Sequence, residues 1–258
     1  IERPCKSTAD VDRALSVPYV PLNYDASDYA RIKREVGDHG IIMASLSDPL
    51  LMAADLMEFG AYTVWAMTET AHFARTVEAM HERCMENLRR MLDANVVDLY
   101  RICGPEYATP PYLPPPLFQR FVVPYITAMV DLIHDYGASV RFHCHGKIRE
   151  VLDMIVATGA DGLDPCEGPP DGDIPLAALK ARLRGTGISI FGNLQLKLLE
   201  HGTTEEVEET VKACMRAAKA GGGYVIMPTA APINIPLAKQ TEENYLRFID
   251  TALAYGNY

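Results

Sequence analysis

The stretch Ser139-Val140-Arg141-Phe142-His143-Cys144-His145-Gly146 decides how this sequence folds. It is an apolar run that ends in polar side chains and a glycine, which predicts a buried strand over residues 139–145. Apolar positions at helical spacing follow over residues 148–157, and another short apolar run covers residues 162–166. The order strand, helix, strand is typical of a βα unit with parallel strands.

The same alternation extends in both directions along the chain. Further strands are predicted at residues 40–46, 96–103, 188–193 and 224–228. Helices are predicted at residues 50–58, 62–67, 69–94, 117–136, 174–183, 204–220 and 242–254, with Pro124 as a kink inside the fourth of these. Thr203 or Thr204 is the expected N-cap of the helix at residue 204, because glutamates follow in its first turn.

We predict a single domain with the (β/α)₈ barrel fold, spanning residues 1–258. Such a barrel typically needs about 250 residues, and the chain has 258. Six strands are predicted with a clear pattern, so the other two are expected in the irregular residues 1–36 or in a segment missing before Ile1. An open doubly wound sheet is the alternative; no glycine-rich phosphate loop follows an early strand, which counts against it.

Composition limits the classes of partner and compartment. The formal net charge of −10 repels phosphate backbones, so we expect no nucleic-acid partner. No apolar run reaches the roughly 18 residues of a membrane span, so we expect no membrane partner either. The six cysteines are scattered through predicted helices and strands without a secretory signal, which favours reduced thiols in a cytoplasmic protein.

Candidate functional residues lie where the predicted parallel strands end, because active sites of such folds gather at the C-terminal strand ends. Glu106, in a proline-rich loop, suits the orientation of a substrate, or is a solvated loop charge. Glu167 suits general acid or base catalysis, or belongs to a turn before a helix that Asp173 caps. The complete set is Arg101, Glu106, Arg141, His143, His145, Cys166, Glu167, Asn193, Gln195 and Met227.

His143 and His145 lie two residues apart at the end of the predicted strand. Residues two apart on a strand point to the same side, so His143 and His145 share a face and Cys144 faces the core. Two imidazoles at this spacing can bind one metal ion, with Cys166 or Glu167 completing the site. The alternative is a pair of histidines that form hydrogen bonds at the strand ends and bind no metal.

At these residues the sequence resembles the uroporphyrinogen decarboxylase superfamily, which includes methyltransferases that work with corrinoid proteins. The resemblance covers about residues 95–258. It rests on His143-Cys144-His145-Gly146, Phe191-Gly192-Asn193-Leu194 and Glu243-Asn244-Tyr245. It also rests on residues 116–125, 164–180 and 222–228. The family fold is a (β/α)₈ barrel, which agrees with the alternation of strands and helices.

The resemblance implies membership of one of two branches of the superfamily, the decarboxylases or the zinc methyltransferases. The decarboxylases carry an arginine-rich motif near the N-terminus, and residues 1–40 contain none. The zinc methyltransferases carry a His-x-Cys pair that matches His143 and His145, and a distant cysteine whose position here is Ala230. The resemblance therefore implies a zinc site that has lost one ligand, with Cys166, Glu167 or Glu106 as a substitute.

The leading hypothesis is a methyltransferase that moves a methyl group between a corrinoid, such as methylcobalamin on a partner protein, and a small molecule. His143, His145 and Cys166 would hold Zn²⁺, while Glu106, Glu167 and Asn193 would be catalytic. Arg101, Arg141, Gln195 and Met227 would bind the substrate. The second hypothesis is a decarboxylase of a tetrapyrrole or another carboxylated substrate. The third is a non-catalytic barrel that binds a corrinoid or tetrapyrrole protein.

Overall fold

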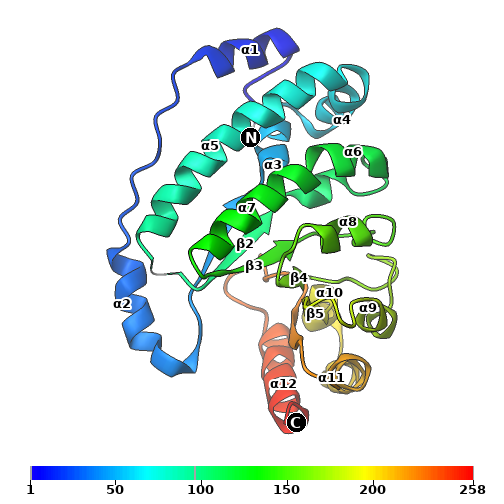
Figure 1. The fold of residues 1–258 in the computed structure, drawn as a ribbon. Helices are drawn as coiled ribbons and strands as arrows, with labels where there is room; N and C mark the ends of the chain where they lie inside the picture. Colours follow the sequence, from blue (N-terminus) through cyan, green and yellow to red (C-terminus); the bar gives the residue numbers. More distant parts are fainter. Residues whose placement is uncertain (1, 96, 258) are drawn as a thin grey trace. The chain divides into compact units, whose positions relative to one another are not determined.

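The computed structural model describes residues 2–95 and 97–257. Contacts between its residues divide the chain into two compact units. The first unit contains residues 1–143 and 150–160, and the second contains residues 144–149 and 161–258. Each unit holds three parallel strands with helices packed on them (Figure 1). The prediction of a single domain stays a prediction.

In the first unit the three strands are β1 (Met43–Ser47), β2 (Leu99–Cys103) and β3 (Ser139–His143). All pair in parallel, and the register places Ser47 beside Cys103 and Arg101 beside Arg141. The strands therefore end together at one edge. The helices of this unit are α1 (Thr8–Ser16), α2 (Ser27–Val36), η1 (Gly37–His39), α3 (Pro49–Ala54), α4 (Phe59–Thr68), α5 (Thr70–Asp93), η2 (Pro105–Ala108), α6 (Pro115–Phe121), α7 (Val123–Asp135) and α8 (Leu152–Ala157).

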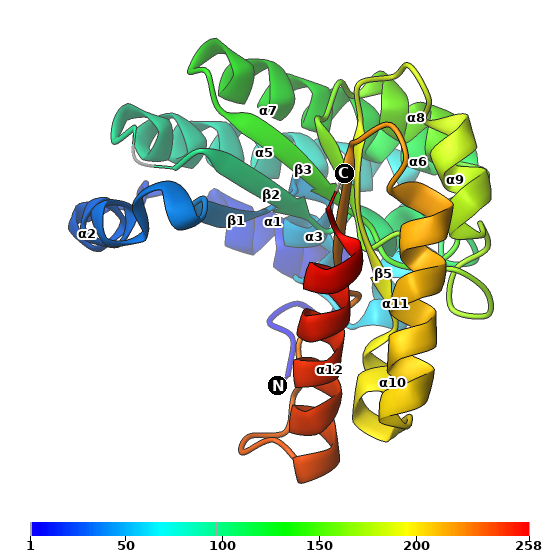
Figure 2. The ribbon, with the colours of Figure 1, turned by 90° about the horizontal axis from the view of Figure 1, so that it is seen from below.

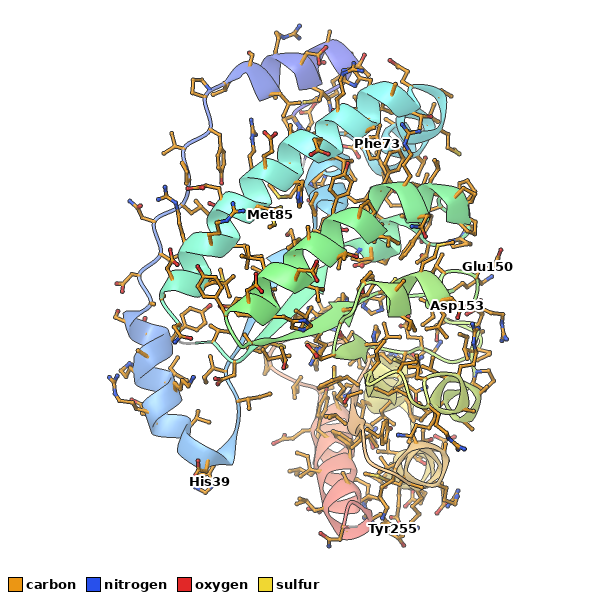
Figure 3. The ribbon with its side chains drawn as sticks, in the orientation of Figure 1. His39, Phe73, Met85, Glu150, Asp153 and Tyr255 are labelled. Carbon is orange, nitrogen blue, oxygen red and sulfur yellow. The ribbon has the colours of Figure 1, made fainter. Side chains whose placement is uncertain are left out.

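The core of the first unit lies between its sheet and the helices α5 and α7, which run side by side over β2 and β3 (Figures 1 and 2). The predicted helix over residues 69–94 is confirmed as α5, and the apolar stripe that predicted it is buried. Phe73 lies near the start of α5 and Met85 further along it (Figure 3). Each large apolar side chain of this stripe contributes about 1.5–3 kcal/mol when fully buried.

In the second unit the strands are β4 (Gly162–Asp164), β5 (Ser189–Leu194) and β6 (Tyr224–Pro228). They pair in parallel, β4 with β5 and β5 with β6. The helices α11 and α12 run side by side (Figure 2), and Leu194, Val211 and Phe248 belong to the core that they cover. The helices are α9 (Leu176–Arg182), α10 (Leu196–His201), α11 (Thr204–Ala218) and α12 (Lys239–Tyr255).

Four sequence-based predictions need correction. The described part of residues 1–36 forms α1 and α2 rather than strands, so the described residues hold six strands, all at predicted positions. The strand over residues 139–145 ends at His143, so strand alternation does not govern His145. Likewise β4 ends at Asp164, before Cys166. Asp173 does not cap α9, because its Oδ1 accepts a hydrogen bond from the Arg149 N–H instead.

The helix predicted over residues 117–136 is divided at Val122 into α6 and α7, which meet at a bend of 41°. Pro124 lies in the first turn of α7, where a missing N–H costs no helical hydrogen bond. The kink expected from Pro124 is thus confirmed as a full break. Among the described helices, none alone has the length and apolar composition of a membrane span; α6 and α7 together reach both.

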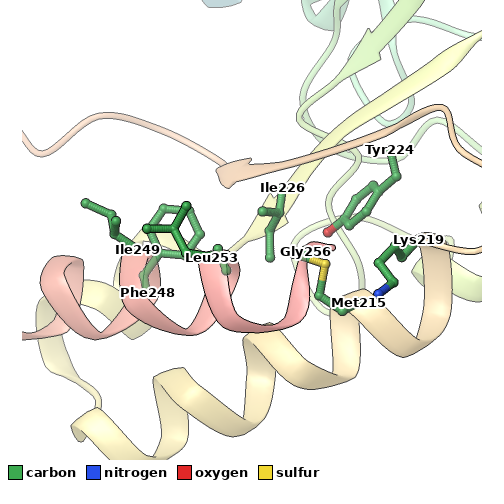
Figure 4. Close-up of a pocket in the computed structure, with 9 residues that line it drawn as sticks. Met215, Lys219, Tyr224, Ile226, Phe248, Ile249, Leu253 and Gly256 are labelled. Carbon is green, nitrogen blue, oxygen red and sulfur yellow. The ribbon is translucent and has the colours of Figure 1, made fainter. Parts of the chain in front are cut away.

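A cavity of about 290 Å³ lies in the second unit, bounded by β6, α11 and α12 (Figure 4). Its lining includes Met215, Tyr224, Phe248 and Leu253, and it is mainly apolar. Tyr224 is the first residue of β6, so the cavity lies toward the start of that strand. The candidate residues, in contrast, lie at the strand ends, where parallel α/β folds carry their active sites.

Candidate functional site

The first unit brings Arg101 and His143 together from neighbouring strands. Arg101 Nη2 lies 2.7 Å from His143 Nδ1, and both side chains are at least partly buried. A guanidinium group can only donate a hydrogen bond, so Nδ1 of His143 must accept it. The imidazole is therefore the neutral tautomer with its proton on Nε2. Arg101 in this way makes His143 a hydrogen-bond donor at Nε2.

Glu106 faces that donor from η2. Its Oε1 is 4.0 Å from His143 Nε2, and its Oε2 accepts a hydrogen bond of 3.1 Å from the Gly104 N–H. The carboxylate is thus fixed by the backbone on one side and directed toward His143 on the other. This arrangement disagrees with the alternative of a fully solvated loop charge. Arg101, His143 and Glu106 form one polar array at the ends of β2 and β3, hereafter the Glu106 array.

Arg141 belongs to the same face of the first sheet. It is the register partner of Arg101 and lies two residues before His143 on β3, and only 8% of it is exposed. Residues paired across parallel strands, and residues two apart along one strand, share a face. The predicted orientation of Arg141 with His143 is therefore confirmed. Two guanidinium groups lie on this face.

The second unit pairs His145 with Glu167. His145 Nδ1 is 3.2 Å from Glu167 Oε1, and the other carboxylate oxygen accepts a hydrogen bond of 2.8 Å from the Gly146 N–H. A carboxylate accepts hydrogen bonds, so it favours a proton on Nδ1 of His145. His145 is thus a donor at Nδ1, whereas His143 is an acceptor at Nδ1.

The remaining candidates of the second unit are held by its backbone and by one another. Cys166 is 1% exposed, and its Sγ donates to the Leu163 carbonyl at 3.2 Å. Asn193 Nδ2 donates to the Cys166 carbonyl at 3.0 Å, and Asn193 Oδ1 accepts from Cys214 Sγ at 3.5 Å. Both ends of the Asn193 amide therefore have internal partners, and a substrate would have to share them.

Two further predicted residues lie near the ends of β5 and β6. Gln195 follows β5, and its Oε1 accepts a hydrogen bond of 3.4 Å from Thr229 Oγ1. Met227 is half-buried on β6. Cys144, expected in the core, is 1% exposed, which confirms its packing role. No disulfide links the described cysteines, and all six are thiols.

A metal site was expected at His143, His145 and Cys166. Among the described residues no group of three or more His, Cys, Asp or Glu side chains is placed to hold a metal ion. Two of the three expected ligands have hydrogen-bond partners within their own unit, because His143 Nδ1 accepts from Arg101 and the Cys166 thiol donates to the Leu163 carbonyl. The zinc-ligand role of these side chains stays a prediction.

Asp48 is a polar residue that the sequence did not single out. It directly follows β1, is fully buried, and is the N-cap of α3. Its position at a strand end could have indicated a functional residue. The Asp-Pro pair there, however, is also typical of an ordinary helix start.

The parallel strands, the helices packed on them and the polar side chains at the strand ends define the class of parallel α/β proteins, which includes many enzymes. The uroporphyrinogen decarboxylase (URO-D) family model matches residues 1–252, so the chain belongs to that family. Two curated relatives are named methylcobamide:CoM methyltransferase MtaA, from Methanosarcina barkeri and from its strain Fusaro / DSM 804. Each is 23% identical over 202 residues, which cover 76% of this chain and 54% of the relative. The chain thus spans about half the length of these enzymes.

A solved structure is also similar, a methyltransferase from Methanosarcina mazei. It matches with a TM-score of 0.71 and 19% sequence identity, over 89% of this chain and 63% of that chain. This likeness confirms the predicted fold class, the α/β fold of the (β/α)₈ type. At this identity it is evidence for the fold alone.

Proposed function

We propose that this protein is a methyltransferase that moves a methyl group between a corrinoid on a partner protein and a small molecule. The observation that carries the proposal is the Glu106 array, in which a histidine donor and a carboxylate face one another at the ends of β2 and β3. The methyltransferase names of the relatives support the same class of reaction.

The chain's own residues would handle the proton of the acceptor. The corrinoid, when bound, supplies the methyl group. As the acceptor heteroatom gains the methyl group it loses its proton, and Glu106 takes that proton as a general base. His143 orients the acceptor through its Nε2–H, and Arg101 keeps the histidine in that tautomer. No step of this scheme depends on a metal ion, and Zn²⁺ stays a prediction for this chain.

The sequence also predicts roles for residues of the second unit, and these stay predictions within that unit. His145, which pairs with Glu167, would bind a polar group of a substrate or move a proton. Asn193 would position a substrate while it holds the Cys166 carbonyl, and Gln195 and Met227 would contact a substrate near the ends of β5 and β6.

Kinetics with Glu106→Gln test this assignment. The amide keeps the shape of the side chain but cannot take up a proton, so kcat for methyl transfer from methylcobalamin to a panel of thiols and phenols should fall by about 10²–10⁴-fold. Loss of methylcobalamin absorbance measures the rate. The matched control is Glu150→Gln, an exposed carboxylate before α8 (Figure 3). Equal rates for Glu106→Gln and wild type would refute the role of Glu106.

Decarboxylation is the second candidate, and one observation favours it. Arg101 and Arg141 are register partners on one face of the first sheet, and guanidinium groups bind carboxylates in bidentate fashion. A carboxylated tetrapyrrole would suit such a pair. Release of carbon dioxide from a porphyrinogen, lost in Arg141→Gln but retained in the exposed variant Arg89→Gln, would support this function in place of methyl transfer.

A further inference from the structure

Asp48 is a buried carboxyl group that the proposed reaction does not use. Its Oδ1 accepts a hydrogen bond of 2.7 Å from the Leu51 N–H, and its own N–H donates to the Cys103 carbonyl at 2.8 Å. The first bond fixes the side chain, and the second ties the end of β1 to the end of β2. The Leu51 N–H therefore orients the carboxyl group, while the backbone of Asp48 is held by β2.

Gly104 connects this carboxyl group to Glu106. A Cβ atom at Gly104 would lie 2.2 Å from Asp48 Oδ1 and 2.6 Å from Leu51 Cβ, and φ of Gly104 is +129°. Only glycine tolerates both the close approach and this backbone conformation. The N–H of the same glycine donates to Glu106 Oε2. Asp48 and Glu106 thus both lie against Gly104.

The surroundings of Asp48 disfavour a negative charge on its carboxyl group. Asp48 Oδ2 is buried and finds no hydrogen-bond partner among the described residues. The titratable groups that interact electrostatically with Asp48 are Glu106 from η2, Tyr62 from α4 and Cys84 from α5, and none of these is a cation. Burial first, and then the charge of Glu106, raise the pKa of Asp48 well above its usual value, against the lowering effect of the Leu51 N–H.

We propose that Asp48 is a positioning residue for Glu106 that stays un-ionised in the folded protein. With its proton on Oδ2, the group needs no counter-ion and adds no negative charge beside Glu106. Its bulk fills the space beneath Gly104 and so supports the turn whose N–H holds Glu106. Its part in catalysis rests on the proposed function of Glu106, whereas its protonation state does not.

The stability of wild type and Asp48→Asn across pH tests the protonation state. An aspartic acid in the unfolded chain ionises near pH 3.9, whereas Asp48 keeps its proton in the folded chain. The folded state then binds more protons, so the stability from un-ionised Asp48 is complete below about pH 3.9 and is lost toward the folded pKa. Above about pH 5 the unfolding constant of wild type should rise about tenfold per pH unit relative to Asp48→Asn.

The control for urea unfolding between about pH 5 and about pH 8 is Asp38→Asn, an exposed carboxylate that should keep the wild-type slope. Infrared spectra give a second readout, a C=O band of an un-ionised carboxylic acid in wild type that is lost in Asp48→Asn. Parallel slopes for wild type and Asp48→Asn, or the lack of that band, would overturn the proposal, because Asp48 would then be ionised.

Activity separates the positioning role from general stability. Asp48→Ala removes the support of Gly104 and should lower kcat for methyl transfer about tenfold or more, and Asp48→Asn should recover most of that loss because it is isosteric with the neutral acid. If Asn is no better than Ala in protein that is folded and shows the predicted pH slope, the positioning role fails. Wild-type protein without any methyl transfer refutes the proposed function but leaves the stability result intact.

Discussion

His143 and His145 carry the same side chain, yet the structure gives them opposite hydrogen-bonding roles. Arg101 makes Nδ1 of His143 an acceptor, and Glu167 makes Nδ1 of His145 a donor. The chemistry of an imidazole follows from the partner of its other nitrogen. Both partners come from other elements of the chain, so the repeated histidine in the sequence predicted a shared metal site, whereas the structure predicts two different tasks.

The tautomer of His143 can be measured. Long-range ¹H–¹⁵N NMR spectra should show the proton of His143 on Nε2 in wild type, because Nδ1 accepts from Arg101. In Arg101→Leu that preference should be lost, whereas the exposed variant Arg89→Leu should retain it. A proton on Nδ1 of His143 in the wild-type spectrum would contradict the arrangement of the Glu106 array.

At the scale of elements, local sequence signals predicted the start of α11 and the end of α7. Thr203 Oγ1 accepts from the Glu206 N–H, and Glu206 Oε2 accepts from the Thr203 N–H, so α11 begins with the expected capping box. Such a box satisfies two N–H groups that would otherwise lack partners. Gly137, with φ of +76°, follows α7 as predicted.

Thr203→Ala should therefore lower the free energy of unfolding by about 1 kcal/mol, because the first turn of α11 loses its cap. Thr203→Ser keeps the oxygen and should lie within a few tenths of a kcal/mol of wild type. Urea unfolding at neutral pH measures both. Equal losses in the two variants would show that the methyl group, and not the cap, is what stabilises this end of α11.

Elements whose limits depend on distant contacts were predicted less well. The periodicity of apolar residues found α5 and all six described strands, since burial of one face imposes it. It extended β3 to His145 and β4 to Cys166, beyond the ends of these strands at His143 and Asp164. It also placed Asp173 at the start of a helix, because a hydrogen bond with the Arg149 N–H is invisible in the local pattern. Asp48 was missed because its environment depends on Gly104 and Glu106.

At the scale of the whole molecule, the chain consists of two compact units that each present polar residues where parallel strands end. The fold class and the family were predictable, since βα alternation and the order of motifs both survive at 23% identity. The reaction was not, because the relatives' names and the Glu106 array favour methyl transfer, whereas the arginine pair also suits decarboxylation. A single measurement has to separate the two reactions.

That measurement follows an isotopic label. Wild-type protein is incubated with ¹³CH₃-labelled methylcobalamin and a panel of thiols and phenols, and mass spectrometry then searches for ¹³C-methylated acceptor. We predict a methylated product that forms catalytically with wild type and at least about 10²-fold more slowly with Glu106→Gln. No labelled acceptor above the enzyme-free control, together with carbon dioxide release from a porphyrinogen under the same conditions, would contradict the assignment of this protein as a methyltransferase.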